Sequence, residues 1–217
     1  MLFNRPSGRI LESGVLAGAE LTLWRGTTFL FEELSFAVPS GTALLVEGPN
    51  GAGKTSLLRV IAGLTLPESG TITWRGGDFQ EQIRAGRLRM AFSGHALALK
   101  PELSTRANLE FFARLAGLQE MVGETLALTG LRDCADLEVR QLSAGQKRRA
   151  ALARILLSRA ELWLLDEPQT NLDAAGRQAV EAAIRNHLGQ GGTVVVAAHQ
   201  TLDLGSASVS HLRLGDA

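Results

Sequence analysis

A glycine-rich loop between a strand pattern and a helix pattern restricts the possible folds of this chain more than any other segment. Residues 48–55 read GPNGAGKT and fit the pattern G-x-x-x-x-G-K-[ST]. TALLVE at 42–47 has the character of a buried strand, and a helix is expected from about Lys54 to Ala62, ended by Gly63. Glycines let successive backbone N–H groups point at phosphate oxygens. The segment therefore predicts a strand, a phosphate-binding loop and a helix.

This loop predicts Mg-ATP as the ligand. Lys54 is expected to reach the β- and γ-phosphates, where it also assists catalysis, and the Thr55 hydroxyl is expected to ligate Mg²⁺. The helix N-terminus adds partial positive charge. The expected nucleotide-binding residues of the loop are Gly48, Pro49, Asn50, Gly51, Ala52, Gly53, Lys54, Thr55 and Ser56.

Two adjacent carboxylates predict the second half of the same site. LWLLD at 162–166 reads as a short apolar strand that ends at Asp166, followed by Glu167. Asp166 is expected to hold the metal, and Glu167 to polarise the attacking water. An acidic pair at a strand end can also be a solvated turn. Because both halves occur in the expected order, the hydrolytic site is favoured, and Trp163 within the strand is expected to pack in the core.

One histidine follows a buried strand at a position suited to catalysis. His199 comes directly after TVVVAA at 193–198. In open α/β sheets ligands bind at the carboxyl ends of the strands, so His199 is expected to meet the γ-phosphate. His187 and His211 have no such context and are expected to be structural or at the surface.

The order of strand and helix patterns predicts the fold class. Short β-branched runs alternate with helical patterns, which is typical of an α/β fold with a mostly parallel sheet. Further strands are expected at 19–24, 34–38, 70–76 and 88–94, whereas about Leu97 to Ser158 reads as helical. We expect one domain over residues 1–217. Its core would span about 1–94 and 160–217, and its helical insertion about 95–159.

Charge and composition exclude several classes of protein. Lys plus Arg equals Asp plus Glu at 22 each, so no net field attracts nucleic acid. The lone Cys134 excludes an internal disulfide and is expected to be a small buried residue. No apolar run approaches the roughly 18 residues of a membrane-spanning helix, and no leader pattern opens the chain. We therefore expect a soluble chain that reaches a membrane only through a partner.

A second anion-binding pattern raises the question of why one chain has two. LSAGQ at 142–146 opens a helix, with Ser143 as a good N-cap. A capped helix start explains the serine but not Gly145 or the lack of acids. The economical hypothesis is a head-to-tail dimer, in which one chain's LSAGQ completes the site of the other. Asp173 in TNLD is expected to cross that interface. The residues assigned to bind nucleotide here are Ser143, Ala144, Gly145, Gln146 and Asp173.

The ordered set of motifs resembles the nucleotide-binding subunits of ABC transporters. GPNGAGKTS, LSAGQ, LWLLDEP, TNLD and His199 carry the resemblance over essentially the whole chain. The resemblance implies a RecA-like P-loop NTPase core, a small antiparallel β subdomain and an α-helical subdomain. It also implies that ATP closes a homodimer, that hydrolysis reopens it, and that integral membrane permease subunits are driven by the cycle.

Within that family, EGPNGAGKTSLLRVIAGL, GHALALKPELS and QLSAGQKRRAALARILLS resemble the ATP-binding subunits of the haem exporters of bacterial cytochrome c maturation. This implies a cytoplasmic chain, peripheral at the inner membrane, that serves haem export or haem-chaperone release. No direct haem binding is expected, and the permease contact is expected around Leu97 to Phe112. The alternative is an ABC transporter for another substrate. A non-transport ABC protein is disfavoured because the balanced charge argues against binding to nucleic acid. A kinase or a GTPase is disfavoured because neither would need LSAGQ.

Three positions depart from the general family pattern. His95 stands where most relatives have a glutamine that touches Mg²⁺ and water, so it is a candidate metal ligand, although imidazole binds Mg²⁺ poorly. A second hypothesis is that His95 couples the site to the membrane partner. The adenine platform is expected at Arg25, which is slightly favoured, or at Trp24. The alternative is Trp24 in the core. The LSAGQ segment corresponds to the family's signature turn, and its Ala144 stands where relatives commonly have a glycine.

Overall fold

The structure is a computed structural model that describes residues 15–26, 28–198 and 201–215. At its centre lies a parallel five-stranded sheet with the strand order β6-β7-β8-β3-β9. Its strands are β3 (Thr42–Glu47), β6 (Met90–Ser93), β7 (Leu162–Asp166), β8 (Thr193–Ala197) and β9 (Ser208–Arg213). Every residue of β7 and β8 is buried, as expected for strands that are covered on both faces. The strands predicted before the glycine loop and before the two carboxylates are confirmed as β3 and β7.

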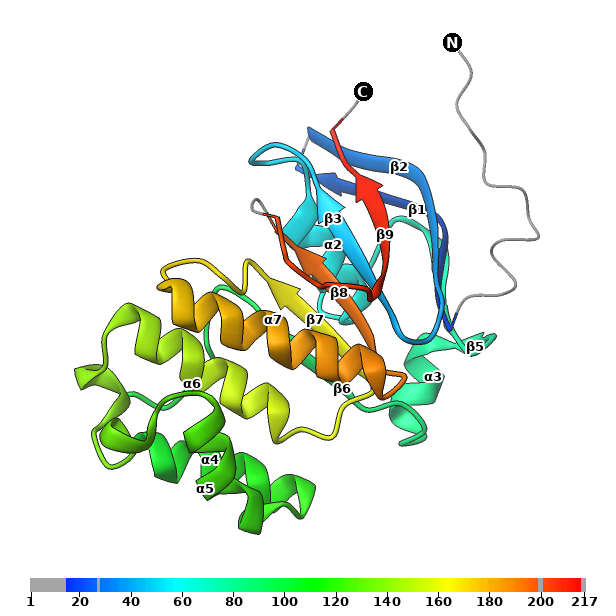
Figure 1. The fold of residues 1–217 in the computed structure, drawn as a ribbon. Helices are drawn as coiled ribbons and strands as arrows, with labels where there is room; N and C mark the ends of the chain where they lie inside the picture. The colour runs from blue at the N-terminus through cyan, green and yellow to red at the C-terminus, as the bar shows by residue number, and fades with distance from the viewer. Residues whose placement is uncertain (1–14, 27, 199–200, 216–217) are drawn as a thin grey trace.

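Two helices cover opposite faces of this sheet, because alternate residues of each strand point to opposite sides. Leu44 and Val46 of β3 pack with α2 (Lys54–Ile61), while Ala43 and Leu45 belong to the cluster that contains α7 (Ala174–Gly189). Figure 1 shows α7 lying across one face of the sheet and α2 behind β3. The helix predicted after the loop begins at Lys54, and Ala62 and Gly63 end it.

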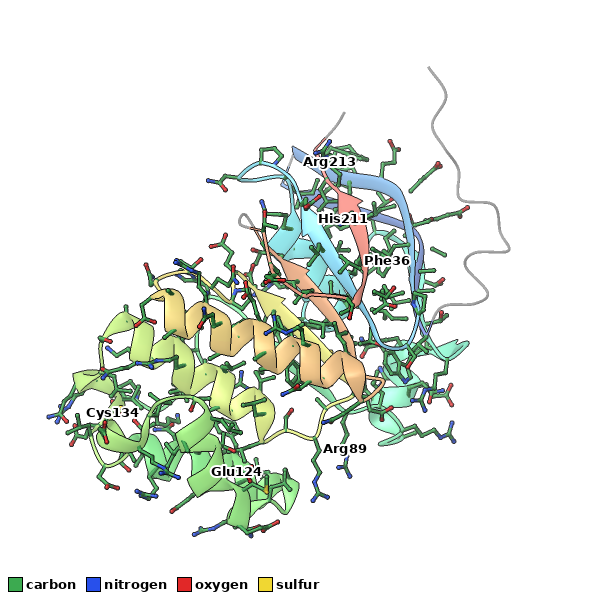
Figure 2. The ribbon with its side chains drawn as sticks, in the orientation of Figure 1. Phe36, Arg89, Glu124, Cys134, His211 and Arg213 are labelled. Carbon is green, nitrogen blue, oxygen red and sulfur yellow. The ribbon has the colours of Figure 1, made fainter. Side chains whose placement is uncertain are left out.

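A second, antiparallel sheet closes the α2 side with the order β2-β1-β4-β5. It consists of β1 (Leu16–Arg25), β2 (Thr28–Val38), β4 (Ser69–Trp74) and β5 (Gly77–Asp78), followed by α3 (Phe79–Arg84). Its core residues, among them Phe36, share one apolar cluster with α2 (Figure 2). The predicted strands at 19–24 and 34–38 are therefore real, but each is part of a longer strand.

The middle of the chain forms helices with an apolar cluster of their own. They are α4 (Thr105–Ala116), η1 (Gln119–Met121), α5 (Val122–Leu128), η2 (Arg132–Cys134), η3 (Val139–Gln141) and α6 (Ala144–Leu156). Cys134 is buried in their cluster, as predicted, and Figure 2 places it among these helices. The predicted helical stretch is confirmed from Thr105 onward, whereas residues 97–104 are not helical. None of the helices in the described residues has the length and apolarity needed to cross a bilayer.

The last turn of α7 carries a partly buried histidine. The His187 ring stacks on the Trp163 ring with centroids 3.9 Å apart and an interplanar angle of 10°. Its Nε2 atom lies 3.2 Å from the Glu161 carbonyl oxygen. Burial lowers the pKa of His187, and the bonds to the backbone of Glu161 and Thr193 oppose this. Trp163 is 4% exposed, so its predicted place in the core is confirmed.

This histidine predicts a loss of stability in mild acid. Because its folded pKa lies below the unfolded value of about 6.5, the unfolded chain takes up the proton first as the pH falls. The free energy of unfolding in urea should therefore fall from about pH 7.5 to about pH 5.5. His187→Phe keeps the stacked ring but not the titration, and it should show a smaller fall. Parallel curves for the two proteins would contradict this assignment.

Candidate nucleotide-binding site

The glycine loop follows β3 and needs its glycines for two reasons. Gly48, Gly51 and Gly53 have φ values of 141°, 87° and 97°, which side-chain-bearing residues rarely adopt. A Cβ atom on Gly48 would also lie 2.3 Å from the Leu214 carbonyl oxygen, just beyond β9. The end of β9 is bonded there, because the Leu214 N–H donates to the Glu47 carbonyl at 2.9 Å. The chain's last strand therefore braces the loop, a role that sequence patterns did not reveal.

Lys54 is held against the loop that precedes it. Its side chain is buried at 7% exposure, and Nζ donates to the carbonyl oxygens of Gly48 and Pro49 at 2.7 and 2.9 Å. A buried ammonium requires such partners. The lysine thus places one full positive charge within the ring of backbone groups predicted to bind phosphate.

Two of the three predicted metal ligands, Thr55 and Asp166, meet at the carboxyl edge of the sheet. Thr55 Oγ1 lies 3.0 and 3.2 Å from the two carboxylate oxygens of Asp166, which is only 6% exposed. Burial raises the pKa of Asp166, while the bond from Thr55 and the charges of Arg148 and His95 lower it. A hydroxyl and a carboxylate are hard oxygen donors, which Mg²⁺ prefers. This pair therefore fits a magnesium ion.

Glu167 occupies a strained position beside this pair. Its φ is 49°, in the left-handed region that a glutamate rarely adopts. Its N–H donates to the Ala197 carbonyl at 2.8 Å, and its carboxylate accepts from the Thr170 hydroxyl at 3.1 Å. Backbone strain of this kind gathers at functional sites, where surrounding contacts hold it in place.

The two predicted site histidines have different outcomes. His199 lies outside the described residues. His95 is exposed on the segment after β6, near enough to lower the pKa of Asp166. Within the described part of the chain, no three His, Cys, Asp or Glu side chains converge as metal ligands. The predicted ligand set of Thr55, Asp166 and His95 is of another kind, because Thr55 contributes a hydroxyl, and His95 as a ligand stays a prediction.

The signature turn is a capped helix start. Ser143 Oγ accepts from the Gln146 N–H at 3.2 Å, and Gln146 Oε1 accepts from the Ser143 N–H at 2.8 Å, which is a capping box. The N–H groups of Ala144 and Gly145 lie in the first turn, where no intrahelical carbonyl reaches them. Ser143 and Ala144 are exposed, and a Cβ on Gly145 would approach the Asn171 carbonyl to 3.1 Å.

The remaining predicted site residues lie on separate elements. Asp173 is exposed and caps α7, because its side chain accepts from the Gly176 N–H at 2.8 Å. Trp24 is 47% exposed and meets Phe29 edge-on with centroids 4.5 Å apart. The alternative that Trp24 packs in the core is therefore wrong. The side chain of Arg25 lies outside the described part of the structure.

Sequence reasoning missed one residue that reaches the site. Arg148 of α6 donates to the carbonyl oxygens of Asp166 and Glu167 at 3.2 and 2.5 Å. The only available signal is the basic run of residues 147–149, and such a run usually marks a solvated face. Only the packing of α6 beside β6 and the end of β7 distinguishes this arginine from its neighbours.

Comparisons with known proteins agree with this geometry. The ABC transporter family model matches residues 31–170. The cytochrome c biogenesis ATP-binding export protein CcmA of Tatumella citrea is 43% identical over 200 residues, covering 92% of this chain and 96% of that protein. The protein with the same name in Rhodospirillum rubrum is 45% identical over 196 residues, covering 90% of this chain and 84% of that protein.

Solved structures give the same fold. A dimeric ATP-binding cassette in a post-hydrolysis state, bound to ADP and Pi, superimposes with a TM-score of 0.78. It is 22% identical and covers 92% of this chain and 96% of that one. The architecture is therefore the α/β P-loop NTPase fold, with its antiparallel sheet and its group of helices.

The glycine pair Gly48 and Gly51 provides a test of the brace from β9. Both have positive φ, but a Cβ on Gly51 would meet nothing within 4 Å. Gly51→Ala should lower the free energy of unfolding by about 1–2 kcal/mol from backbone strain alone. Gly48→Ala should lower it by about 1–3 kcal/mol more, because its methyl group collides with the Leu214 carbonyl. Urea denaturation measures both, and equal losses would count against the brace.

Proposed function

Because this chain belongs to the ABC transporter family, and within it to the cytochrome c biogenesis ATP-binding export proteins, we propose that it powers haem export or haem-chaperone release in c-type cytochrome biogenesis. The single observation that carries this is the 43% identity to such a protein over 92% of the chain. The site geometry supports it, since the glycine loop, Thr55 and Asp166 meet at one sheet edge.

ATP binding is assigned to the loop and the residues around it. The loop N–H groups and Lys54 hold the phosphates, while Thr55 and Asp166 hold Mg²⁺, which neutralises phosphate charge when bound. The adenine ring stacks either on Trp24 or on Arg25. Trp24 is exposed on β1, the strand that pairs with β2. Gly53 adjoins Leu30 and Phe31 of β2, which supports a base position near this hairpin.

Hydrolysis is assigned to in-line attack of water on the γ-phosphate. The carboxylate of Glu167 accepts a hydrogen bond from the attacking water and orients it. His199, which follows β8 in the sequence, is assigned to donate to the γ-phosphate. Lys54 neutralises charge that develops on the phosphate oxygens, so positioning and electrostatics supply most of the rate acceleration.

The second anion site belongs to an ATP-dependent, head-to-tail homodimer. The side chains of Ser143 and Gln146 bond to the helix start of their own chain. The backbone N–H groups of Ala144 and Gly145 are therefore the donors offered to the partner's γ-phosphate. Asp173 crosses the interface beside them from an exposed position. The dimeric ATP-binding cassette of the same fold supports a dimer.

The membrane permease subunits dock on the helical part of the chain. We assign residues about 95–159 to a helical subdomain and about 1–94 and 160–217 to the core. Phe111 and Leu115 of α4 are 57% and 74% exposed, and Leu115 lines a groove of about 320 Å³ together with Phe112 and Arg154. This surface supports a permease contact around 97–112. The chain then lies at the cytoplasmic face of the inner membrane and binds neither haem nor nucleic acid.

Glu167→Gln should trap the ATP-bound dimer. Loss of the carboxylate that orients water should lower kcat by about 10²–10⁴-fold, while ATP still binds. Size-exclusion chromatography with Mg-ATP should then show a dimer for Glu167→Gln. The matched control Glu167→Gln with Lys54→Ala should stay monomeric, because the phosphates lose their cation. If Glu167→Gln remains monomeric even with the permease subunits present, the proposal that one chain's LSAGQ completes the partner's site would be wrong.

The transport role is tested in the host. The gene is deleted, and membrane proteins are stained for covalent haem after complementation with wild type or Lys54→Ala. All c-type cytochromes should vanish in the deletion strain, and only the wild type should restore them. If covalent haem still stains in the deletion strain, and the host has no second copy of the gene, the role in cytochrome c biogenesis is wrong. The chain would then be the ATPase of an ABC transporter for another substrate.

A further inference from the structure

One arginine of the signature helix holds three backbone carbonyls at the catalytic edge of the sheet. Arg148 Nη2 donates to the Asp166 and Glu167 carbonyl oxygens at 3.2 and 2.5 Å, and Nη1 donates to the Gly94 carbonyl at 3.3 Å. These carbonyls come from two places, the end of β7 and the turn after β6. A single guanidinium therefore fixes α6 to both.

We propose that Arg148 is a positioning residue that holds the Glu167 carboxylate in its hydrolytic geometry. This inference rests on the proposed function, because it assigns Glu167 to the attacking water. It adds a role for α6 within its own chain, which is separate from the role of the LSAGQ turn toward a partner.

The strain at Glu167 explains why such a residue is needed. A φ of 49° is strained for a non-glycine residue, so the conformation persists only if its surroundings enforce it. The Glu167 N–H is fixed by Ala197, and its carbonyl accepts from the Thr170 N–H at 3.2 Å and from Arg148 at 2.5 Å. Of these two donors to the carbonyl, only the arginine comes from outside the loop. Arg148 therefore ties the strained peptide to a rigid helix.

Arginine suits this position better than lysine. Its planar guanidinium carries donors that diverge at fixed angles, so two nitrogens reach carbonyls of different strands at once. The side chain is partly buried, and this burial lowers the pKa of Arg148, while the charges of Asp166 and Glu167 raise it. The guanidinium remains charged, since an arginine does not deprotonate in a protein. Its bonds to the carbonyls are thus charge-assisted and strong.

The neighbouring Lys147 provides a matched control. It lies on the same helix and carries the same charge, but its Nζ donates to the Arg140 carbonyl at 3.3 Å, within the helical region. Loss of Lys147 removes one cation from α6 without touching the peptide at residues 166–167. An effect caused only by the loss of a positive charge or by a less stable helix should therefore occur when either Arg148 or Lys147 is replaced.

The test compares Arg148→Gln, Arg148→Lys and Lys147→Gln in the purified full chain with its permease subunits. Arg148→Gln should lower the ATPase kcat about tenfold or more, with KM for ATP within about twofold of wild type. Arg148→Lys should recover part of kcat, because an ammonium can reach only one of the two strands. Lys147→Gln should match wild type in both constants.

Hydrogen exchange of the backbone provides a readout independent of activity. Without the arginine, exchange at the Glu167 and Thr170 amides should rise at least about tenfold in Arg148→Gln, but not in Lys147→Gln. A wild-type kcat or unchanged exchange in Arg148→Gln would overturn the proposal. If Arg148→Gln does not fold, Arg148→Lys provides the test. A kcat of Arg148→Lys equal to that of the wild type would then overturn the proposal. A wild type without ATPase activity contradicts the proposed function instead, and exchange still tests the contact.

Discussion

The hydrogen bond between Thr55 and Asp166 joins the two halves of this molecule. Its partners are 111 residues apart in the chain, and β8 lies between their strands in the sheet. Parallel strands present their carboxyl ends at one edge, so a loop after β3 and a carboxylate at the end of β7 are brought together by topology alone. A buried carboxylate without polar partners would be expensive. The Thr55 hydroxyl that stabilises Asp166 is therefore also the group that we propose to bind a magnesium ion with it.

Two segments of the candidate site hold unusual backbone conformations, and both are braced from a distance. Gly48 lies under the carbonyl of Leu214, which follows the chain's last strand. Glu167 adopts a positive φ and is held by Ala197 and by Arg148. The strain at Glu167 costs free energy that packing elsewhere must offset. The braces come from β8, α6 and the segment after β9, so the site is a property of the whole fold.

Helix α6 makes two kinds of contact, one at its first turn and one through arginines further along the helix. Its first turn is closed by a capping box between Ser143 and Gln146, which leaves backbone N–H groups as the outward donors. Further along, Arg148 meets the catalytic edge of its own chain, and Arg154 donates to the Phe92 carbonyl of β6 at 2.7 Å. A capped turn and a functional turn are thus compatible readings of LSAGQ, because the cap uses side chains and the ligand needs main chain.

The sequence by itself determined the elements and the chemistry of this protein. Hydrophobic period, glycine spacing and strand-end carboxylates are local signals, so β3, the loop, α2 and β7 were predicted within a few residues. The same signals named Lys54, Thr55 and Asp166 as the candidates for phosphate and metal binding. Only the tertiary structure decided which of several similar residues contact the candidate site. It exposed Trp24, singled out Arg148 and brought Leu214 onto the loop. Such contacts depend on packing between distant segments, and no local pattern records it.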